Sequence, residues 1–208
     1  MRTLTLLLAV ALLAVPLLGQ GAVAPPHLTT FSPAKAFAAS AWGGSTGAGC
    51  AQIHLIPYPT KPGKFLVSMT ITALTGGKGG YELVTGVYDG NTGTATPDKP
   101  NLAVALNTSG TEFGMTMYHT GLMAVYESNA KPGASGTEVW LATRTSPTAA
   151  WKDKGKITNA PTANNQTYWD PALANIGGKL HLLYMLKRTS GQADIAAAPL
   201  DLNKMTID

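Results

Sequence analysis

From Ala51 onward, short runs of alternating apolar and polar residues are separated by clusters of glycine, proline, asparagine and aspartate every eight to fifteen residues. Strict alternation is typical of β-strands, because successive side chains of a strand point to opposite faces. No window of this region keeps helical spacing over several turns. The pattern therefore predicts an all-β fold of short antiparallel strands.

Three of these runs resemble one another. They are "GKFLVSMT", "GLMAVYES" and "GKLHLLYM", and their first residues Gly63, Gly121 and Gly178 lie 58 and 57 residues apart. A second run follows each of them across a polar, glycine-containing loop, and the starts of "YELVTGVYDG", "TEVWLATRTS" and "ADIAAAPLDL" are each 56 residues apart. The loops have the composition of antiparallel hairpin connections. Two strand positions with nearly the same period predict a repeated unit.

A unit of just under sixty residues made of antiparallel strands fits one blade of a β-propeller, which repeats four-stranded sheets around an axis. We expect the strand after each glycine to be central in its blade. Alternation places Leu180, Leu182 and Tyr184 on one face and His181 and Leu183 on the other, and blades bury both faces. A β-sandwich whose strands recur by accident is the alternative.

Residues 51–208 have room for about three such units, whereas closed propellers usually contain four to eight blades. The sequence therefore predicts a partial or truncated β-propeller of about three four-stranded blades. Either the chain is a piece of a longer protein, or it closes its ring with another copy. An open set of blades has two unpaired flanks, so self-association through open blade edges is expected.

The first 24 residues have the features of a signal peptide. Arg2 precedes "LTLLLAVALLAVPLLG", an apolar run that is short for a membrane span and ends near the small residues of "QGAVA". A membrane-anchored leader is the alternative. We expect a secreted or periplasmic protein with no membrane span after cleavage, in which residues 25–50 form a linker or irregular entry segment and residues 51–208 form the β-propeller-like domain.

The charge pattern argues against a nucleic-acid partner. Charged residues make up 12% of the chain, and the net charge of +4 comes from scattered lysines. The densest group, Lys152, Lys154 and Lys156, is interrupted by Asp153 and Gly155 and is expected to be a solvated loop.

A metal site and a cofactor are not expected. Cys50 is the only cysteine, which excludes an intrachain disulfide and a zinc-thiolate cluster. The histidines have no metal-ligand spacing; they are His27, His54, His119 and His181.

The stretch "TYWDPALANIGGKLHLLYM", with "GLMAVYESNAKPGASGTEVWLATRTSPTAAWKDKGKI" one unit earlier, resembles the five-bladed propeller glycosidases of the furanosidase superfamily, which cleave arabinans, xylans and fructans. The resemblance extends from about Thr111 to Asp201 and is a likeness of pattern. It implies an exported, carbohydrate-recognising propeller, with a glycoside-hydrolase-like fragment as one form of it. The matching positions are Asp170, Pro171, Gly177, Gly178, Tyr184, Trp140, Ala142, Ser146 and Trp151.

Hydrolysis of a glycoside needs two carboxyl groups that face each other across the bond, and the family takes its carboxylates from inner strands of successive blades. Asp170 lies eight residues before Gly178, and the equivalent positions before Gly121 and Gly63 hold Phe113 and Leu55, which are not acids. Glu112 is adjacent, and a register slip of one residue would turn it to the channel, although such a slip reverses the faces of a strand. Glu127 and Glu138 are expected on second and third strands, farther from the axis. The chain is thus expected to hydrolyse glycosides only if missing blades supply further carboxylates.

The resemblance implies that Asp170 adjusts the pKa of the catalytic acid or orients the substrate. The alternative is an Asx-type turn that caps the following strand beside Pro171. Trp169 and Tyr168 would stack on a sugar face if the site exists, but buried blade aromatics are the commoner use of such residues. A non-catalytic structural or protein-binding β-propeller is therefore the alternative function.

Overall fold

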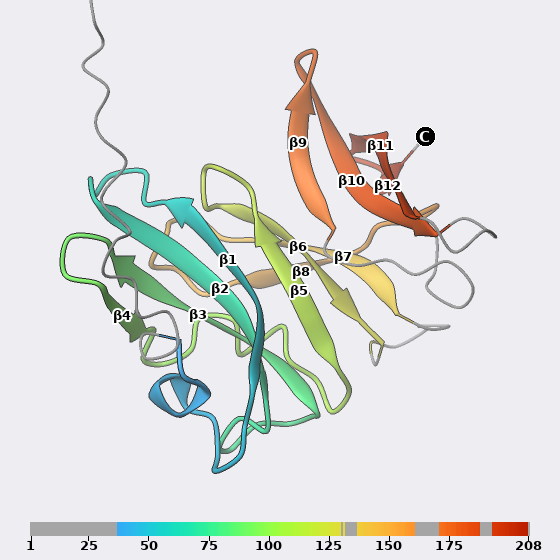
Figure 1. Cartoon of the computed structure of the whole chain (residues 1–208). Coiled ribbons are helices and arrows are strands. Elements are labelled where there is room, and N and C mark those ends of the chain that lie inside the picture. The colour runs from blue at the N-terminus through green and yellow to red at the C-terminus, as the bar shows by residue number, and fades with distance from the viewer. Residues whose placement is uncertain (1–36, 130, 132–136, 161–170, 188–192, 208) are drawn as a thin grey trace, which may run out of the picture. The chain divides into compact units, whose positions relative to one another are not determined.

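A computed structural model describes residues 37–129, 131, 137–160, 171–187 and 193–207. The described strands form three antiparallel four-stranded sheets, each in the order of the sequence (Figure 1). The first sheet contains β1 (Cys50–Pro57), β2 (Lys64–Thr72), β3 (Tyr81–Asp89) and β4 (Thr94–Pro97). The second contains β5 (Glu112–Met117), β6 (Met123–Ser128), β7 (Glu138–Thr143) and β8 (Lys152–Lys156). The third contains β9 (Ala172–Ile176), β10 (Lys179–Lys187), β11 (Ala193–Asp201) and β12 (Thr206–Ile207).

The predicted repeat corresponds to these sheets. The strands after the three glycines are β2, β6 and β10, and each is the second strand of its sheet, so the prediction of a central strand is confirmed. The glycines adopt positive φ angles, 74° at Gly63, 68° at Gly121 and 81° at Gly178. Residues with a Cβ rarely adopt this conformation. The recurring glycine is thus explained by the turn between the first and second strands of each sheet.

Two apolar clusters join the sheets face to face. The first sheet packs against the second through a cluster that includes Leu66, Leu83, Met115, Tyr126 and Trp140. The second packs against the third through a cluster that includes Val125, Leu141, Leu173, Leu182 and Ala198. In β10, Leu180, Leu182 and Tyr184 all belong to or pack against this second cluster, as the alternation predicts. The chain is therefore all-β, with the sheet-on-sheet packing of a partial propeller.

The middle repeat differs in register from its neighbours. Val67, Val125 and Leu182 each lie four residues after their glycine. Val67 faces the outer side of the first sheet and Leu182 packs toward the second sheet, which precedes its own, whereas Val125 packs toward the third sheet, which follows its own. The difference arises because Leu122 separates Gly121 from the start of β6, while β2 and β10 begin directly after their glycines. One extra residue reverses the faces of a strand, so the glycines are not equivalent markers of side-chain direction.

The outer face of the first sheet is covered by the chain that precedes β1. Val67, Met69 and Ile71 of β2 are fully buried in a cluster with Phe37 and Trp42. Trp42 is the last residue of a short 3₁₀ helix, η2 (Ala39–Trp42), and its ring stacks on Phe37 with centroids 6.1 Å apart. One of the two flanks that the sequence leaves open is therefore covered by the chain itself.

The expectation of a lysine-rich loop is wrong. Lys152, Lys154 and Lys156 belong to β8, the edge strand of the second sheet, which pairs with β7 across a register shift. Lys156 makes an ion pair of 2.6 Å with Glu138 on β7. The lysines are compatible with a strand because an edge strand has one free side, and charged side chains there discourage pairing with other chains. In the part of the chain that the structure describes, no helix is long and apolar enough to cross a bilayer.

Candidate functional site

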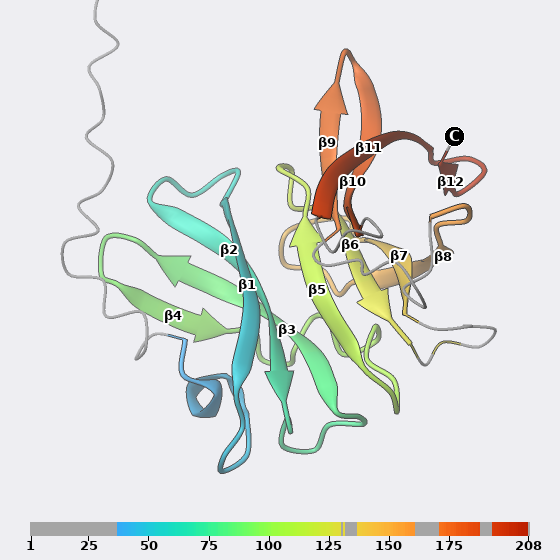
Figure 2. The ribbon, with the colours of Figure 1, turned by 45° about the vertical axis from the view of Figure 1, so that its right-hand side comes forward.

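The first strands of the first two sheets, β1 and β5 (Figure 2), contact each other. Each contains an irregularity, and a hydrogen bond between Gln52 and Gly114 joins the two irregular segments. The register of β1 shifts between Ala51 and His54, and that of β5 shifts between Phe113 and Thr116. Inside the shifts, Gln52 and Gly114 adopt positive φ angles of 50° and 63°. Such β-bulges leave backbone groups without a ladder partner and turn side chains to new directions. The two bulges therefore create a local site between the sheets.

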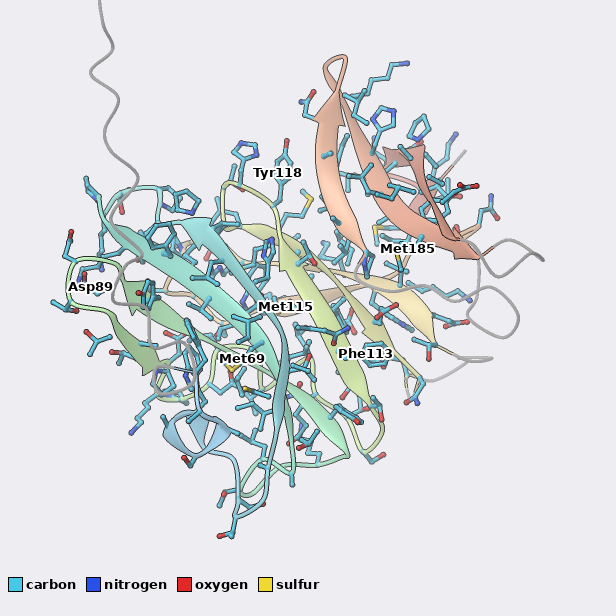
Figure 3. All side chains as sticks on the ribbon, in the orientation of Figure 1. Met69, Asp89, Phe113, Met115, Tyr118 and Met185 are labelled. Atoms are coloured by element: carbon cyan, nitrogen blue, oxygen red, sulfur yellow. The ribbon has the colours of Figure 1, made fainter. Side chains whose placement is uncertain are left out.

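Side chains of the first sheet form hydrogen bonds with backbone groups of β5 at and beside its bulge. The N–H of Gly114 donates to Oε1 of Gln52 over 2.9 Å, and the N–H of Met117 donates to Nδ1 of His54 over 3.2 Å. The hydroxyl of Ser68 on β2 donates to the carbonyl oxygen of Met115 over 2.6 Å. Met115 is placed along β5 in Figure 3, with Met69 on the neighbouring β2. These bonds hold the bulges in fixed positions, because buried backbone groups need partners.

The contact to Met117 also determines the tautomer of His54. A neutral imidazole that accepts a hydrogen bond at Nδ1 carries its proton on Nε2. His54 is half-buried. The proton of His54 therefore lies on the side of the ring away from the backbone of β5.

A hollow of about 110 Å³ lies at the paired bulges. Ile53, 40% exposed, forms part of its wall. The residues that line it are Gln52, Ile53, His54, Gly114, Met115 and Thr116. The hollow combines an amide, an imidazole and a hydroxyl with apolar surface.

No carboxylate lines this hollow among the described residues. Glu112, at the start of β5, is fully buried. It accepts hydrogen bonds from the N–H of Thr108 over 2.8 Å, from the Thr108 hydroxyl, and from the hydroxyl of Ser128 over 2.9 Å. Those bonds fix a turn and a strand start, so Glu112 has a structural role. Phe113 and Leu55 are half-buried and supply no acid.

Glu127 and Glu138 are also away from the hollow. Glu127 lies on β6 and Glu138 on β7, the second and third strands of their sheet, as the sequence predicts. Glu127 is fully buried and Glu138 is 2% exposed. Within the described residues, no cluster of potential metal ligands is found.

Asp170, Trp169 and Tyr168 lie outside the described residues. The sequence places them directly before Pro171 and β9, the first strand of the third sheet, and β9 contacts β5. The paired glycines after β9 form the turn to β10 with φ angles of 59° and 81° at Gly177 and Gly178. The strand arrangement around the expected site is therefore described, but the three residues themselves are not.

Trp151, a matching position of the sequence resemblance, is a core residue. It is 1% exposed, and the guanidinium of Arg144 lies 4.3 Å from the centre of its ring. Nε of Arg144 donates to the carbonyl oxygen of Gly121 over 2.6 Å, and burial lowers the pKa of Arg144 to about 10. Arg144 thus connects the end of β7 to the turn before β6 and packs on Trp151. The tryptophan therefore stabilises the blade.

Sequence reasoning missed Gln52, His54 and Thr116. A signal for one side of the hollow was present, because Gly114 interrupts an alternating run and a glycine inside a strand often marks a bulge. Nothing in the local sequence of β1 indicates the matching bulge at Gln52.

Comparisons with solved structures agree with the fold. The chain is similar to a family 117 glycoside hydrolase from Zobellia galactanivorans, with a TM-score of 0.56 and 12% identity over 76% of this chain and 53% of that one. It is similar to a thermostable family-43 glycoside hydrolase, with a TM-score of 0.52 and 8% identity over 77% of this chain and 51% of that one. An endo-arabinase from Bacteroides thetaiotaomicron gives a TM-score of 0.50 and 17% identity over 71% of this chain and 55% of that one.

The likeness confirms the predicted resemblance to propeller glycoside hydrolases at the level of the fold. The chain spans about half the length of the solved structures that it matches. No protein-family model matches it, and no curated protein matches it in sequence.

Proposed function

We propose that this chain is an exported, carbohydrate-recognising β-propeller module of the glycoside-hydrolase type. The observation that carries the proposal is the hollow at the paired bulges of β1 and β5, which offers an amide, an imidazole and a hydroxyl beside apolar surface. A sugar presents hydroxyl groups and apolar C–H faces together, so it matches this combination. Export is supported by the apolar N-terminal run after Arg2.

Recognition is a better proposal than hydrolysis by this chain alone. Cleavage of a glycosidic bond needs an acid and a second carboxylate, and the described lining of the hollow contains neither. Asp170 would orient the sugar or adjust the pKa of an acid supplied by another blade. Trp169 and Tyr168 would provide stacking surfaces for the sugar ring.

A non-catalytic structural or protein-binding module is the second candidate. One observation favours it: the amide oxygen of Gln52 and Nδ1 of His54 are already occupied by backbone groups of β5. In that case the polar groups of the hollow would serve only to join the two sheets.

Titration calorimetry with arabino-, xylo- and fructo-oligosaccharides tests the proposal. The wild-type chain should bind one of these series, and His54→Ala should weaken that binding about tenfold, the effect of losing one hydrogen bond of about 1.4 kcal/mol. Trp169→Ala should weaken it by roughly 1 to 3 kcal/mol if the ring is a stacking platform. Asp170→Ala should also weaken it.

His119→Ala is the matched control, because His119 is exposed and does not line the hollow. Its affinity should equal that of the wild type. A folded wild-type chain that binds none of the three series would overturn the proposal. Equal losses in His54→Ala and His119→Ala would show that the hollow is not the binding site.

A further inference from the structure

A glycosylation motif of the sequence falls beside the buried part of the first sheet. Asn107, Thr108 and Ser109 form the motif Asn-X-Ser, which accepts N-linked oligosaccharides in exported proteins. Such acceptors usually lie in surface loops, because the attached sugar is bulky. Asn107, however, is only 4% exposed, whereas Ser109 is exposed. The motif is thus accessible at its hydroxyl residue and buried at its acceptor amide.

The amide of Asn107 pairs with the backbone of Leu83 on β3 as a neighbouring strand would. Oδ1 of Asn107 accepts a hydrogen bond of 2.8 Å from the N–H of Leu83, and Nδ2 donates one of 3.0 Å to the carbonyl oxygen of Leu83. Leu83 is fully buried, and buried backbone groups need partners. Both polar atoms of the Asn107 side chain are therefore in use.

This pairing replaces a piece of strand that the first sheet lacks. β4 pairs only with residues 86–89 of β3, so the backbone groups of Leu83 and Thr85 extend beyond it. Asn101 completes the same edge: its Nδ2 donates to the carbonyl oxygen of Leu83 over 2.8 Å, and its Oδ1 accepts from the N–H of Thr85 over 3.3 Å. Asn101 and Asn107 therefore close an edge that would otherwise be available for pairing with another chain.

The hydrogen that Asn107 donates is the one that glycosylation would replace. An amide that pairs through both atoms with one backbone residue donates the hydrogen on the same side as its own oxygen. In N-glycosylation, C1 of the oligosaccharide leaves a lipid-linked diphosphate and bonds to Nδ2, which gives up one hydrogen as a proton. The resulting secondary amide strongly prefers the trans form, in which C1 lies on the side of Oδ1. The sugar and the carbonyl oxygen of Leu83 therefore compete for one position.

The backbone of the motif is also held in place. Nζ of Lys78 donates to the carbonyl oxygen of Asn107 over 3.3 Å, and the N–H of Thr108 donates to the carboxylate of Glu112 over 2.8 Å. Glu112 is fully buried. The Asn107 amide thus cannot turn outward without losing its bonds to Leu83.

We propose that Asn107 is a folding-dependent modification site. An oligosaccharide is transferred from its lipid-linked diphosphate to Nδ2 only before the first sheet closes, and a chain modified there cannot close the edge of β3. The folded chain is protected from modification by its own hydrogen bonds. The proposal does not depend on sugar binding at the hollow, so the failure of one leaves the other standing.

The first test uses an oligosaccharyltransferase that modifies a synthetic peptide of residues 102–113. With the lipid-linked donor, the purified full-length chain should be modified at Asn107 at least about a hundredfold more slowly than the peptide. The reason is that modification then depends on the small population of open chains. Peptide mass spectrometry separates Asn107 from Asn165, the acceptor of a second motif, which lies outside the described residues.

Leu83→Ala keeps the motif and removes a buried side chain from β3. At a temperature where this variant is partly unfolded and the wild type is not, Asn107 should be modified faster in the variant. Val104→Ala is the matched control, because Val104 is close to the motif and 50% exposed; its rate should equal that of the wild type. A folded wild-type chain modified as fast as the peptide overturns the proposal. Equal rates in Leu83→Ala and the wild type also overturn it.

A second test concerns the closed edge itself. Asn107→Asp keeps the acceptor and replaces the donor Nδ2 by an oxygen, so the folding equilibrium should shift toward the unfolded state about tenfold or more. Asn175→Asp is the matched control: Asn175 is exposed, and its Oδ1 accepts from the N–H of Gly178 over 2.9 Å. This variant should be as stable as the wild type in urea denaturation. An Asn107→Asp chain that is equally stable would show that the amide does not close the edge.

Discussion

Gly114 of β5 donates its backbone N–H to Oε1 of Gln52 on β1 over 2.9 Å, and the two residues belong to different sheets. Both have left-handed backbone conformations, with φ angles of 63° and 50°. Each residue therefore depends on the other: the bulge of β5 presents the donor, and the bulge of β1 places the acceptor. This pair forms one side of the hollow and also joins two blades.

Gly114→Ala should destabilise the chain by at least about 1 kcal/mol, because a residue with a Cβ is strained by roughly 1 to 2 kcal/mol in the left-handed region. Urea denaturation measures the free energy of unfolding. Gly49→Ala is the control: Gly49 does not have a positive φ, and a Cβ there would lie 3.6 Å from Oγ1 of Thr72. The control should stay within about 0.5 kcal/mol of the wild type. Equal losses in both variants would contradict the assignment of strain at Gly114.

Gln52→Ala should lower the free energy of unfolding by about 1 kcal/mol, because the buried N–H of Gly114 loses its better acceptor. The Thr70 hydroxyl oxygen, 3.3 Å from that nitrogen, remains as a weaker one. Gln52→Glu keeps an oxygen at the same place and should recover most of the loss. Urea denaturation of both variants checks this, and a glutamate variant no better than the alanine variant would show that the hydrogen bond is not the cause.

Asp98 should make the chain less stable as the pH rises. Burial raises the pKa of Asp98. Two smaller effects lower it: the hydroxyl of Thr85 donates a hydrogen bond of 2.7 Å to Asp98, and Arg144 carries a positive charge. Between the ordinary value of 3.8 and the raised pKa, the folded state binds more protons than the unfolded state, so stability falls with rising pH in that window. Asp98→Asn removes this contribution. The stability of the wild type relative to Asp98→Asn should be highest below pH 3.8 and decline above it.

Asp89 provides a control of opposite sign. The N–H of Asn91, 3.0 Å from Oδ1 of Asp89, and the ammonium of Lys64 lower the pKa of Asp89. Its contribution is present above pH 3.8 and is lost as the pH falls through the lowered pKa. Relative to Asp89→Asn, the wild type should therefore lose stability on acidification. Unfolding free energies at several pH values, measured for both variants, should show difference curves of opposite slope.

Trp42→Ala should destabilise the chain by about 3 to 5 kcal/mol, as other large truncations in cores do. Trp42 is 3% exposed, and its ring lies so close to Gly86 on β3 that a Cβ there would meet it at 2.7 Å. The truncation would also expose the apolar outer face of the first sheet, so the variant should self-associate more than the wild type. Tyr81→Ala, at a side chain that is 44% exposed on the same strand as Gly86, is the control and should do neither. Thermal unfolding and light scattering measure the two effects.

Much of the fold was predictable from local pattern. A strand alternates with a period of two whatever surrounds it, and a turn with positive φ selects glycine, so Gly63, Gly121 and Gly178 marked the starts of three central strands. The likeness to propeller glycoside hydrolases followed from the same features. The prediction of a loop at the lysines of β8 was wrong because an exposed edge strand and a solvated loop have similar amino-acid composition.

The site could not be found in this way. Whether Val125 faces one sheet or the other depends on one residue, Leu122, inserted before a strand whose faces are both apolar. The hollow depends on two bulges in strands 62 residues apart, whose unpaired groups are satisfied across the interface between sheets.

By itself, the sequence determined the strands, their repetition and the positions of the turns, because these follow from alternation and backbone conformation within a few residues. Only the tertiary structure decided which face of each sheet is covered, that His54 rather than Glu112 lines the hollow, and that Trp42 covers the first sheet while Ile195 is left exposed. These outcomes arise from contacts between residues far apart in the chain, and no local pattern contains them.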